Sequence, residues 1–181
     1  MRTFDIHKVW PVLGEQVESL HVPWLDAHAA RERDPFKILI SCILSLRTQD
    51  KTTEQASAKL FRLASSPAEI ASLSAKAIEK AIFPVGFYRV KAERIRDLSE
   101  VIDKKYHGRV PDSIEELLKL KGVGRKTANL VITLGYGKYG ICVDTHVHRI
   151  ANRWGICRYE EPFGDGIRLE GETSQEILEI N

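Results

Sequence analysis

The chain has 181 residues, of which 43% are hydrophobic and 29% are charged, the composition of an ordinary globular protein. No apolar run approaches the roughly eighteen residues that a membrane helix needs, and the charged first residues lack the layout of a secretory signal. We therefore expect a cytoplasmic protein that contacts no membrane. The net charge of +2 is too small to indicate nucleic acid as a partner by itself.

Hydrophobic residues recur at helical spacing along almost the whole chain, and no segment alternates as a half-buried strand would. Asp34 followed by Pro35 predicts an N-cap and a first helical residue ahead of the apolar run 36–46. Asp50 is expected to cap the next helix, which continues to about Arg62. The pattern predicts an all-α fold, a compact bundle of many short helices.

Two later helix starts show the capping-box pattern, in which a serine is followed by a glutamate three residues on. They are Ser66 with Glu69 and Ser113 with Glu116. Short linkers that contain glycine or proline separate the predicted helices, so we expect close packing between neighbours in the chain.

The segment from about residue 89 to residue 105 is predicted to form a long amphipathic helix. Its apolar residues fall at steps of three and four and are expected to form one buried stripe: Val90, Ile95, Leu98, Val101 and Ile102. The same segment carries a basic cluster, Arg89, Lys91, Arg94 and Arg96. A basic cluster can bind phosphate, but a solvated helix face is the more ordinary explanation.

The stretch 117–130 has the pattern of two helices joined by a tight turn, Gly122-Val123-Gly124. Two glycines permit positive φ and remove side chains, so backbone N–H groups at the start of the second helix could approach a phosphate closely. Such contacts hold a DNA backbone without reading sequence. The alternative is a plain turn between helices, because glycine is common at helix ends.

Lys126 is expected in the first turn of that second helix. The positive end of the helix dipole, together with partial burial, would lower the pKa of its amine. A neutral amine is the nucleophile that imine chemistry requires. The alternative is an ordinary lysine on the surface.

Asp144 stands where the N-cap of a later helix belongs, ahead of apolar positions that mark one helix face up to Trp154. Backbone N–H groups there favour the ionised carboxylate. It is either a purely structural cap or a carboxylate that stabilises positive charge on a substrate. His146 and His148 have no metal-ligand partners at a suitable spacing, so they are expected to lie near DNA or to be structural.

These residues carry a family likeness. The segment LKGVGRKTANLV, with Asp144 eighteen residues after Lys126, resembles the helix–hairpin–helix/Gly-Pro-Asp superfamily of DNA glycosylases, and within it endonuclease III. The similarity extends from about Asp34 to Trp154 and includes ILSLRTQD and VGFYRVKAERI. It implies two lobes that flank a DNA-binding cleft: a helical domain of residues 22–135, and a second, incomplete lobe of residues 1–21 and 136–181.

The resemblance implies a base-excision-repair DNA glycosylase with abasic-site lyase activity on double-stranded DNA, acting as a monomer on oxidised pyrimidines. Lys126 would attack C1′ of an everted nucleoside and form a Schiff base, with Asp144 as its acidic partner. Gly122, Val123, Gly124 and Arg125 would hold phosphate, with a possible monovalent cation on the hairpin carbonyls. The alternatives are a non-catalytic DNA-binding module and a monofunctional glycosylase for another lesion.

Two more residues match family positions that contact DNA. Arg47 falls where many relatives place a glutamine that fills the gap left by the everted base, and arginine could also hydrogen-bond the orphaned base. Phe87 matches a loop position that often carries an apolar wedge between bases. The alternatives are an arginine in an ion pair within the bundle and a phenylalanine in the core. His146, two residues after the aspartate, is also expected to lie near DNA, with a structural role as the alternative.

The chain departs from the family pattern at its end. Relatives carry four cysteines on a 4Fe-4S cluster, whereas this sequence has only Cys42, Cys142 and Cys157, so we expect no cluster and no metal site. Three scattered cysteines also argue against a disulfide framework. Residues 155–181 lack clear resemblance, and one hypothesis is that the segment after Phe163 is a frame-shifted reading of the gene.

Overall fold

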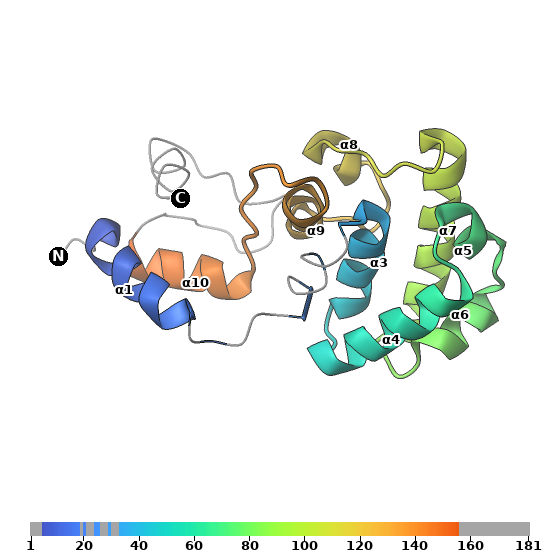
Figure 1. The fold of residues 1–181 in the computed structure, drawn as a ribbon, viewed down its shortest axis with the longest axis horizontal. Helices are drawn as coiled ribbons and strands as arrows, with labels where there is room; N and C mark the ends of the chain where they lie inside the picture. The colour runs from blue at the N-terminus through green and yellow to red at the C-terminus, as the bar shows by residue number, and fades with distance from the viewer. Residues whose placement is uncertain (1–4, 19, 21–23, 26–28, 30–32, 156–181) are drawn as a thin grey trace. The chain divides into compact units, whose positions relative to one another are not determined.

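The computed structural model describes residues 5–18, 20, 24–25, 29 and 33–155 of the chain. All regular structure within these residues is helical, which confirms the predicted all-α fold (Figure 1). None of the described helices combines the length and apolar character required to cross a membrane. Cys157 and the segment covered by the frame-shift hypothesis lie outside the described residues.

The chain divides into two compact units, one of residues 1–21 and 143–181 and the other of residues 22–142. Residues 136–142, which the sequence had placed with the second lobe, group with the larger unit. The smaller unit contains α1 (Ile6–Glu18) and α10 (Thr145–Trp154). The larger unit contains α3 (Pro35–Ser45), α4 (Asp50–Leu63), α5 (Pro67–Ser72), α6 (Ala75–Ile82), α7 (Tyr88–Tyr106), α8 (Ile114–Leu118), α9 (Arg125–Leu130) and the π-helical turn η1 (Val131–Gly135).

Helix α3 runs through the core of the larger unit and contacts α4, α7, α9 and η1 (Figure 1). Its N-terminus is built as predicted, because the Asp34 carboxylate accepts from the backbone N–H groups of Phe36 and Lys37 at 2.9 and 3.2 Å. Pro35 occupies the first helical turn. Of the nine residues from Phe36 to Leu44, all except Lys37 are buried, and they fix this helix as the scaffold for its neighbours.

The capping predictions are met unevenly. Ser66 and Glu69 form the full capping box, whereas Ser113 accepts from the N–H of Glu116 and the carboxylate of Glu116 contacts other residues. Asp50 is not a cap: Gln49 occupies that position and Asp50 begins the helix. A carboxylate one residue into a helix still faces the positive end of its dipole, so the pattern marked the correct helix with the wrong cap.

The buried stripe of α7 differs from the prediction. Ile95, Leu98 and Ile102 are buried against neighbouring helices, but Val90 and Val101 are 55% and 41% exposed. At about 100° per residue, Val90 lies about 140° around the helix from Ile95, whereas Lys91 lies only about 40° from it. The expectation that Lys91 sits on a solvated face is therefore wrong, and this lysine is only 5% exposed.

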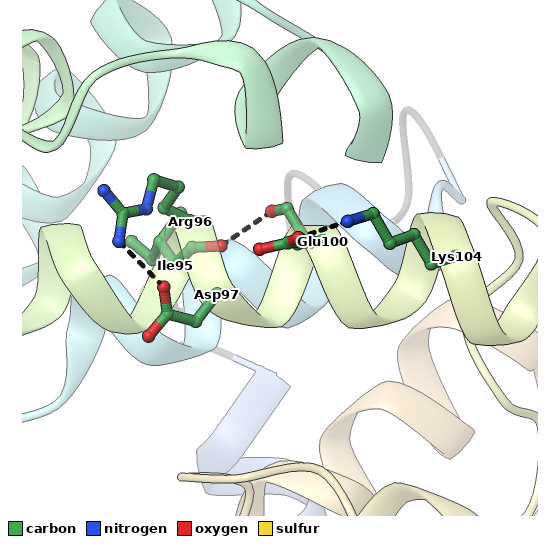
Figure 2. A network of polar contacts seen from close by, with 6 residues as sticks. Ile95, Arg96, Asp97, Glu100 and Lys104 are labelled. Carbon is green, nitrogen blue, oxygen red and sulfur yellow. Dashed lines mark hydrogen bonds and ion pairs between the residues drawn. The ribbon is translucent and has the colours of Figure 1, made fainter.

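The outer face of α7 carries charge pairs of the ordinary solvent-exposed kind. Arg96 pairs with Asp97 at 3.1 Å, and Lys104 pairs with Glu100 one turn earlier (Figure 2). On the buried side, the Ser99 hydroxyl donates to the carbonyl of Ile95 at 2.7 Å within the same helix. The solvated-face interpretation of the basic cluster thus holds for Arg96.

Candidate functional site

The predicted hairpin is present between α8 and α9, in the turn of residues 119–124. Leu120 and Val123 are 3% and 6% exposed, and the N–H of Val123 donates to the carbonyl of Leu120 at 3.0 Å. These two side chains anchor the turn to the core and leave its backbone at the surface. The hairpin is thus an anchored turn with exposed residues, a form that suits backbone contacts to a phosphate.

The two hairpin glycines differ in conformation. Gly122 has φ of +86°, where a side chain would be strained, and a Cβ there would also meet Cδ of Arg94 at 2.5 Å. Gly124 is extended, with φ of −93° and ψ of 174°, and no heavy atom lies within 4 Å of a Cβ built on it. The positive φ that glycine permits is thus adopted by Gly122 and not by Gly124. Nothing in the described structure occupies the space above Gly124.

Basic side chains surround this turn. Lys121, Arg125 and Lys126 are exposed, and Arg94 reaches the hairpin from α7 through its contact with Gly122. Sequence reasoning had treated Arg94 only as part of a basic cluster in its own helix. No pattern within one helix reveals this approach, because it joins segments 28 positions apart in the chain, 94 and 122. The hairpin surface therefore has cations next to an exposed backbone, an arrangement suited to an anion.

Lys126 is the second residue of α9, directly after Arg125, so the prediction that it lies in the first helical turn is confirmed. The side chain is exposed, and the expectation of partial burial is wrong. Arg125 and Lys126 begin α9 at the exposed turn and are both exposed, whereas Thr127 after them is buried. An exposed amine at this position is accessible to a large substrate.

Asp144 caps α10 as predicted. Its carboxylate accepts from the N–H groups of His146 and Val147, both at 2.9 Å. His146 is exposed, and its Nδ1 lies 3.1 Å from the guanidinium of Arg149. Asp144 and Lys126 belong to different units of the chain, so their catalytic partnership stays a prediction.

The structure brings Arg47 and Phe87 together. Arg47 lies in the loop between α3 and α4, residues 46–49, and Phe87 lies in the turn between α6 and α7, residues 83–87. We call these two segments the paired loops. Cζ of Arg47 is 5.9 Å from the centroid of the Phe87 ring, a cation–π arrangement. Phe87 is 64% exposed, so the alternative of a core phenylalanine is wrong. Arg47 is exposed and forms no ion pair with any described residue.

Sequence reasoning missed the group that joins the paired loops, the buried amine of Lys91. Its Nζ donates to the carbonyls of Leu44 and Leu46 at 2.8 and 2.6 Å and to the hydroxyl of Thr48 at 3.2 Å. The same hydroxyl accepts from the N–H of Gly86 at 3.2 Å. Burial lowers the pKa of Lys91 from 10.5 to about 8. The available signal was its position on the apolar face of α7, where a charged residue is unusual.

No three His, Cys, Asp or Glu side chains in the described ranges are grouped to hold a metal ion. Cys42 is 1% exposed within the apolar core of α3, so it is not placed to ligate a cluster. The three cysteines of this sequence do not suit a 4Fe-4S cluster, which needs four thiolates. That the protein holds no such cluster stays a prediction.

Comparison with known proteins places these features in a family. A model of the HhH-GPD superfamily of base excision DNA repair proteins matches residues 40–162. Endonuclease III of Thermotoga maritima is 52% identical over 132 residues, which cover 73% of this chain and 62% of that protein. Endonuclease III of Bacillus subtilis is 38% identical over 128 residues, which cover 71% of this chain and 58% of that protein. The chain thus spans about three fifths of the length of these relatives.

A solved structure gives the same result. It is a trapped endonuclease III–DNA covalent intermediate in an estranged-adenine complex, and it matches with a TM-score of 0.77 at 32% identity over 90% of this chain and 73% of its own. The hairpin, its first-turn lysine and the aspartate cap all lie within the residues that the family model covers. The chain therefore belongs to the HhH-GPD superfamily of base excision DNA repair proteins and, within it, to the endonuclease III family.

Proposed function

We propose that this protein is a DNA glycosylase with abasic-site lyase activity, which removes oxidised pyrimidines from double-stranded DNA as a monomer. The observation that carries the proposal is the exposed amine of Lys126 in the first turn of α9, directly after a hairpin whose backbone faces solvent. A DNA-binding module needs the hairpin but has no use for a nucleophile beside it.

The hairpin would hold the DNA backbone. The open space above Gly124 admits a phosphate close to the main chain, where a side chain would keep it away. Lys121 and Arg125 add positive charge on the same surface. Their contacts would be independent of base sequence, so affinity would fall steeply as salt rises.

The target nucleotide must leave the stack, because its glycosidic carbon is inaccessible within a duplex. The nitrogen of Lys126 attacks C1′ of the everted sugar, the bond from C1′ to the base breaks, and the base departs with the electron pair and gains a proton. Loss of the proton on the lysine nitrogen and opening of the sugar ring give a Schiff base. Removal of a C2′ proton then expels the 3′ phosphate by β-elimination. Asp144 would stabilise the positive charge on the sugar.

Borohydride trapping on an oxidised-pyrimidine duplex tests this proposal, because it reduces the Schiff base to a stable protein–DNA adduct. We expect an adduct with the wild-type protein and none with Lys126→Ala. Lys121→Ala is the matched control, since it removes another exposed hairpin lysine, and it should still form the adduct. If folded wild-type protein binds DNA but forms no adduct, the lyase assignment is wrong and a binding module or monofunctional enzyme is favoured.

A further inference from the structure

Lys91 is the only charged side chain among the buried residues of the described structure. Burying an ammonium group is costly unless its donors are satisfied. Here the three N–H donors meet three oxygens, all uncharged, at 2.6 to 3.2 Å. An apolar side chain of similar length would fill the same space without a buried charge. Packing alone therefore does not explain why a lysine occupies this position.

These hydrogen bonds connect the two paired loops. Lys91 binds the carbonyl of Leu46 and the hydroxyl of Thr48, the residues on either side of Arg47. Thr48 in turn accepts from Gly86, the residue before Phe87. The backbone approach is close, since a Cβ on Gly86 would lie 2.7 Å from the carbonyl oxygen of Arg47. One buried amine thus fixes the immediate neighbours of Arg47 and, through Thr48, of Phe87.

Arg47 and Phe87 also share an uncommon backbone conformation. Their φ angles are +53° and +57°, in the left-handed region that non-glycine residues seldom adopt. Such conformations cost about 1–3 kcal/mol each and persist where surrounding contacts impose them. The hydrogen bonds of Lys91 and Thr48 lie directly beside both residues, at Leu46, Thr48 and Gly86. The result is an exposed arginine and an exposed phenylalanine held side by side.

We propose that Lys91 is a positioning residue that holds Arg47 and Phe87 together as one preformed wedge, which enters duplex DNA where a nucleotide has left the stack. The guanidinium of Arg47 can donate to the edge of the unpaired base, and the Phe87 ring can stack against the neighbouring base step. This proposal rests on the proposed function, since it assumes a duplex with an everted nucleotide. A wedge already in place lowers the ordering cost of insertion.

Three variants disrupt the network in different ways. Lys91→Met keeps most of the side-chain volume and removes all three donors. Thr48→Val removes the hydroxyl that relays to Gly86, and Thr48→Ser retains it. Gly86→Ala leaves the polar groups intact but places a Cβ against the carbonyl of Arg47. Ser99→Ala is the matched control, because it removes a buried hydroxyl of α7 that bonds only within its own helix.

Two substrates separate positioning from folding. The first is a duplex with an oxidised pyrimidine, which requires eversion, and the second is a single strand with an abasic site, which does not. We expect Lys91→Met, Thr48→Val and Gly86→Ala to slow excision from the duplex by about 100-fold, the loss that a misplacement of about 1 Å can produce. Adduct formation with the single strand should be unchanged. Thr48→Ser and Ser99→Ala should match the wild type on both substrates.

A binding readout keeps the test independent of catalysis. In a duplex that carries 2-aminopurine opposite a reduced abasic site, insertion of the wedge should unstack the 2-aminopurine and raise its fluorescence. We expect this rise with the wild type and its loss in Lys91→Met at unchanged DNA affinity. If the wild-type protein forms no trapped adduct, the proposed function is wrong. The fluorescence measurement still tests whether Lys91 positions the wedge, because it does not depend on catalysis. Wild-type behaviour of Lys91→Met, or parallel losses on both substrates with a lower melting temperature, would overturn the positioning role.

Discussion

The hairpin of residues 119–124 and the paired loops both expose groups suited to DNA, but they are held by different means. The hairpin is anchored by two of its own apolar side chains, Leu120 and Val123, and by a bond between their backbones. The paired loops are fixed by a buried amine from α7, which reaches residues 43 to 47 positions earlier in the chain. The hairpin exposes glycine backbone, whereas the paired loops expose the large side chains of two residues whose backbone is left-handed.

Because the two regions are held differently, they should respond differently to substitution. A local turn that buries apolar side chains depends on volume and on glycine conformation, so steric substitutions should affect it most. A loop pair joined by hydrogen bonds to one buried lysine depends on donors and acceptors that come from separate helices. Loss of the hairpin should weaken all DNA binding. Loss of the loop arrangement should affect only substrates that require insertion into the stack.

The largest stability effect is expected from the hairpin anchor. Val123→Ala removes two methyl groups from a side chain that is 6% exposed, and we expect a loss of about 2 kcal/mol in the free energy of unfolding. Val90→Ala is the matched control on α7, because Val90 is 55% exposed, and it should change stability by less than about 0.5 kcal/mol. Urea unfolding measures both. Equal losses would contradict the anchoring role of Val123.

The two hairpin glycines should separate folding from binding. Gly122→Ala places a Cβ at φ of +86° and should cost about 1–2 kcal/mol of stability. Gly124→Ala should cost less than about 1 kcal/mol, since its backbone is extended and the space above it is open. We expect Gly124→Ala nevertheless to weaken binding to undamaged duplex by about 10-fold, or about 1.4 kcal/mol. If an anisotropy titration showed unchanged affinity, the inference that a DNA phosphate binds above Gly124 would be wrong.

The sequence was sufficient for features that depend on neighbours in the chain. The Asp34 and Asp144 caps and the Ser66 box were predicted because a capping side chain reaches only two or three residues ahead. The hairpin was predicted because two glycines mark a turn between helices. The position of Lys126 in a first helical turn followed from the glycines before it. Its exposure did not follow, because exposure depends on which surfaces other helices cover.

Contacts between distant parts of the chain were also not predicted, because they depend on how the helices pack. The proximity of Arg47 and Phe87 is set by two loops 40 positions apart, 47 and 87, and no local pattern encodes it. Lys91 was misassigned because four basic residues in one helix were read as one group. Helical geometry separates them, since Lys91 lies on the same face as Ile95 and Ile102 while Arg96 does not.

A smaller, pH-dependent effect distinguishes the polar anchor of the paired loops. Burial lowers the pKa of Lys91 to about 8 in the folded protein, against 10.5 ordinarily. Between these values the unfolded chain binds more protons than the folded protein, so the free energy of unfolding should rise with pH. We expect wild-type protein to gain stability relative to Lys91→Met from about pH 8 to 10 in urea titrations. A fall over this range would mean that the three oxygen acceptors stabilise the ammonium more than burial opposes it.

The smallest effect is expected from a lysine on the other side of the same helix. Lys104 pairs with Glu100 one turn away on the exposed face of α7, where water screens the charges (Figure 2). Lys104→Met should therefore leave stability, DNA affinity and duplex excision unchanged, although it is the same substitution as Lys91→Met. Unfolding, anisotropy and single-turnover measurements on the two variants provide the comparison. If Lys104→Met slowed excision as much as Lys91→Met, the effect would come from lost positive charge on α7, and not from the geometry of the paired loops.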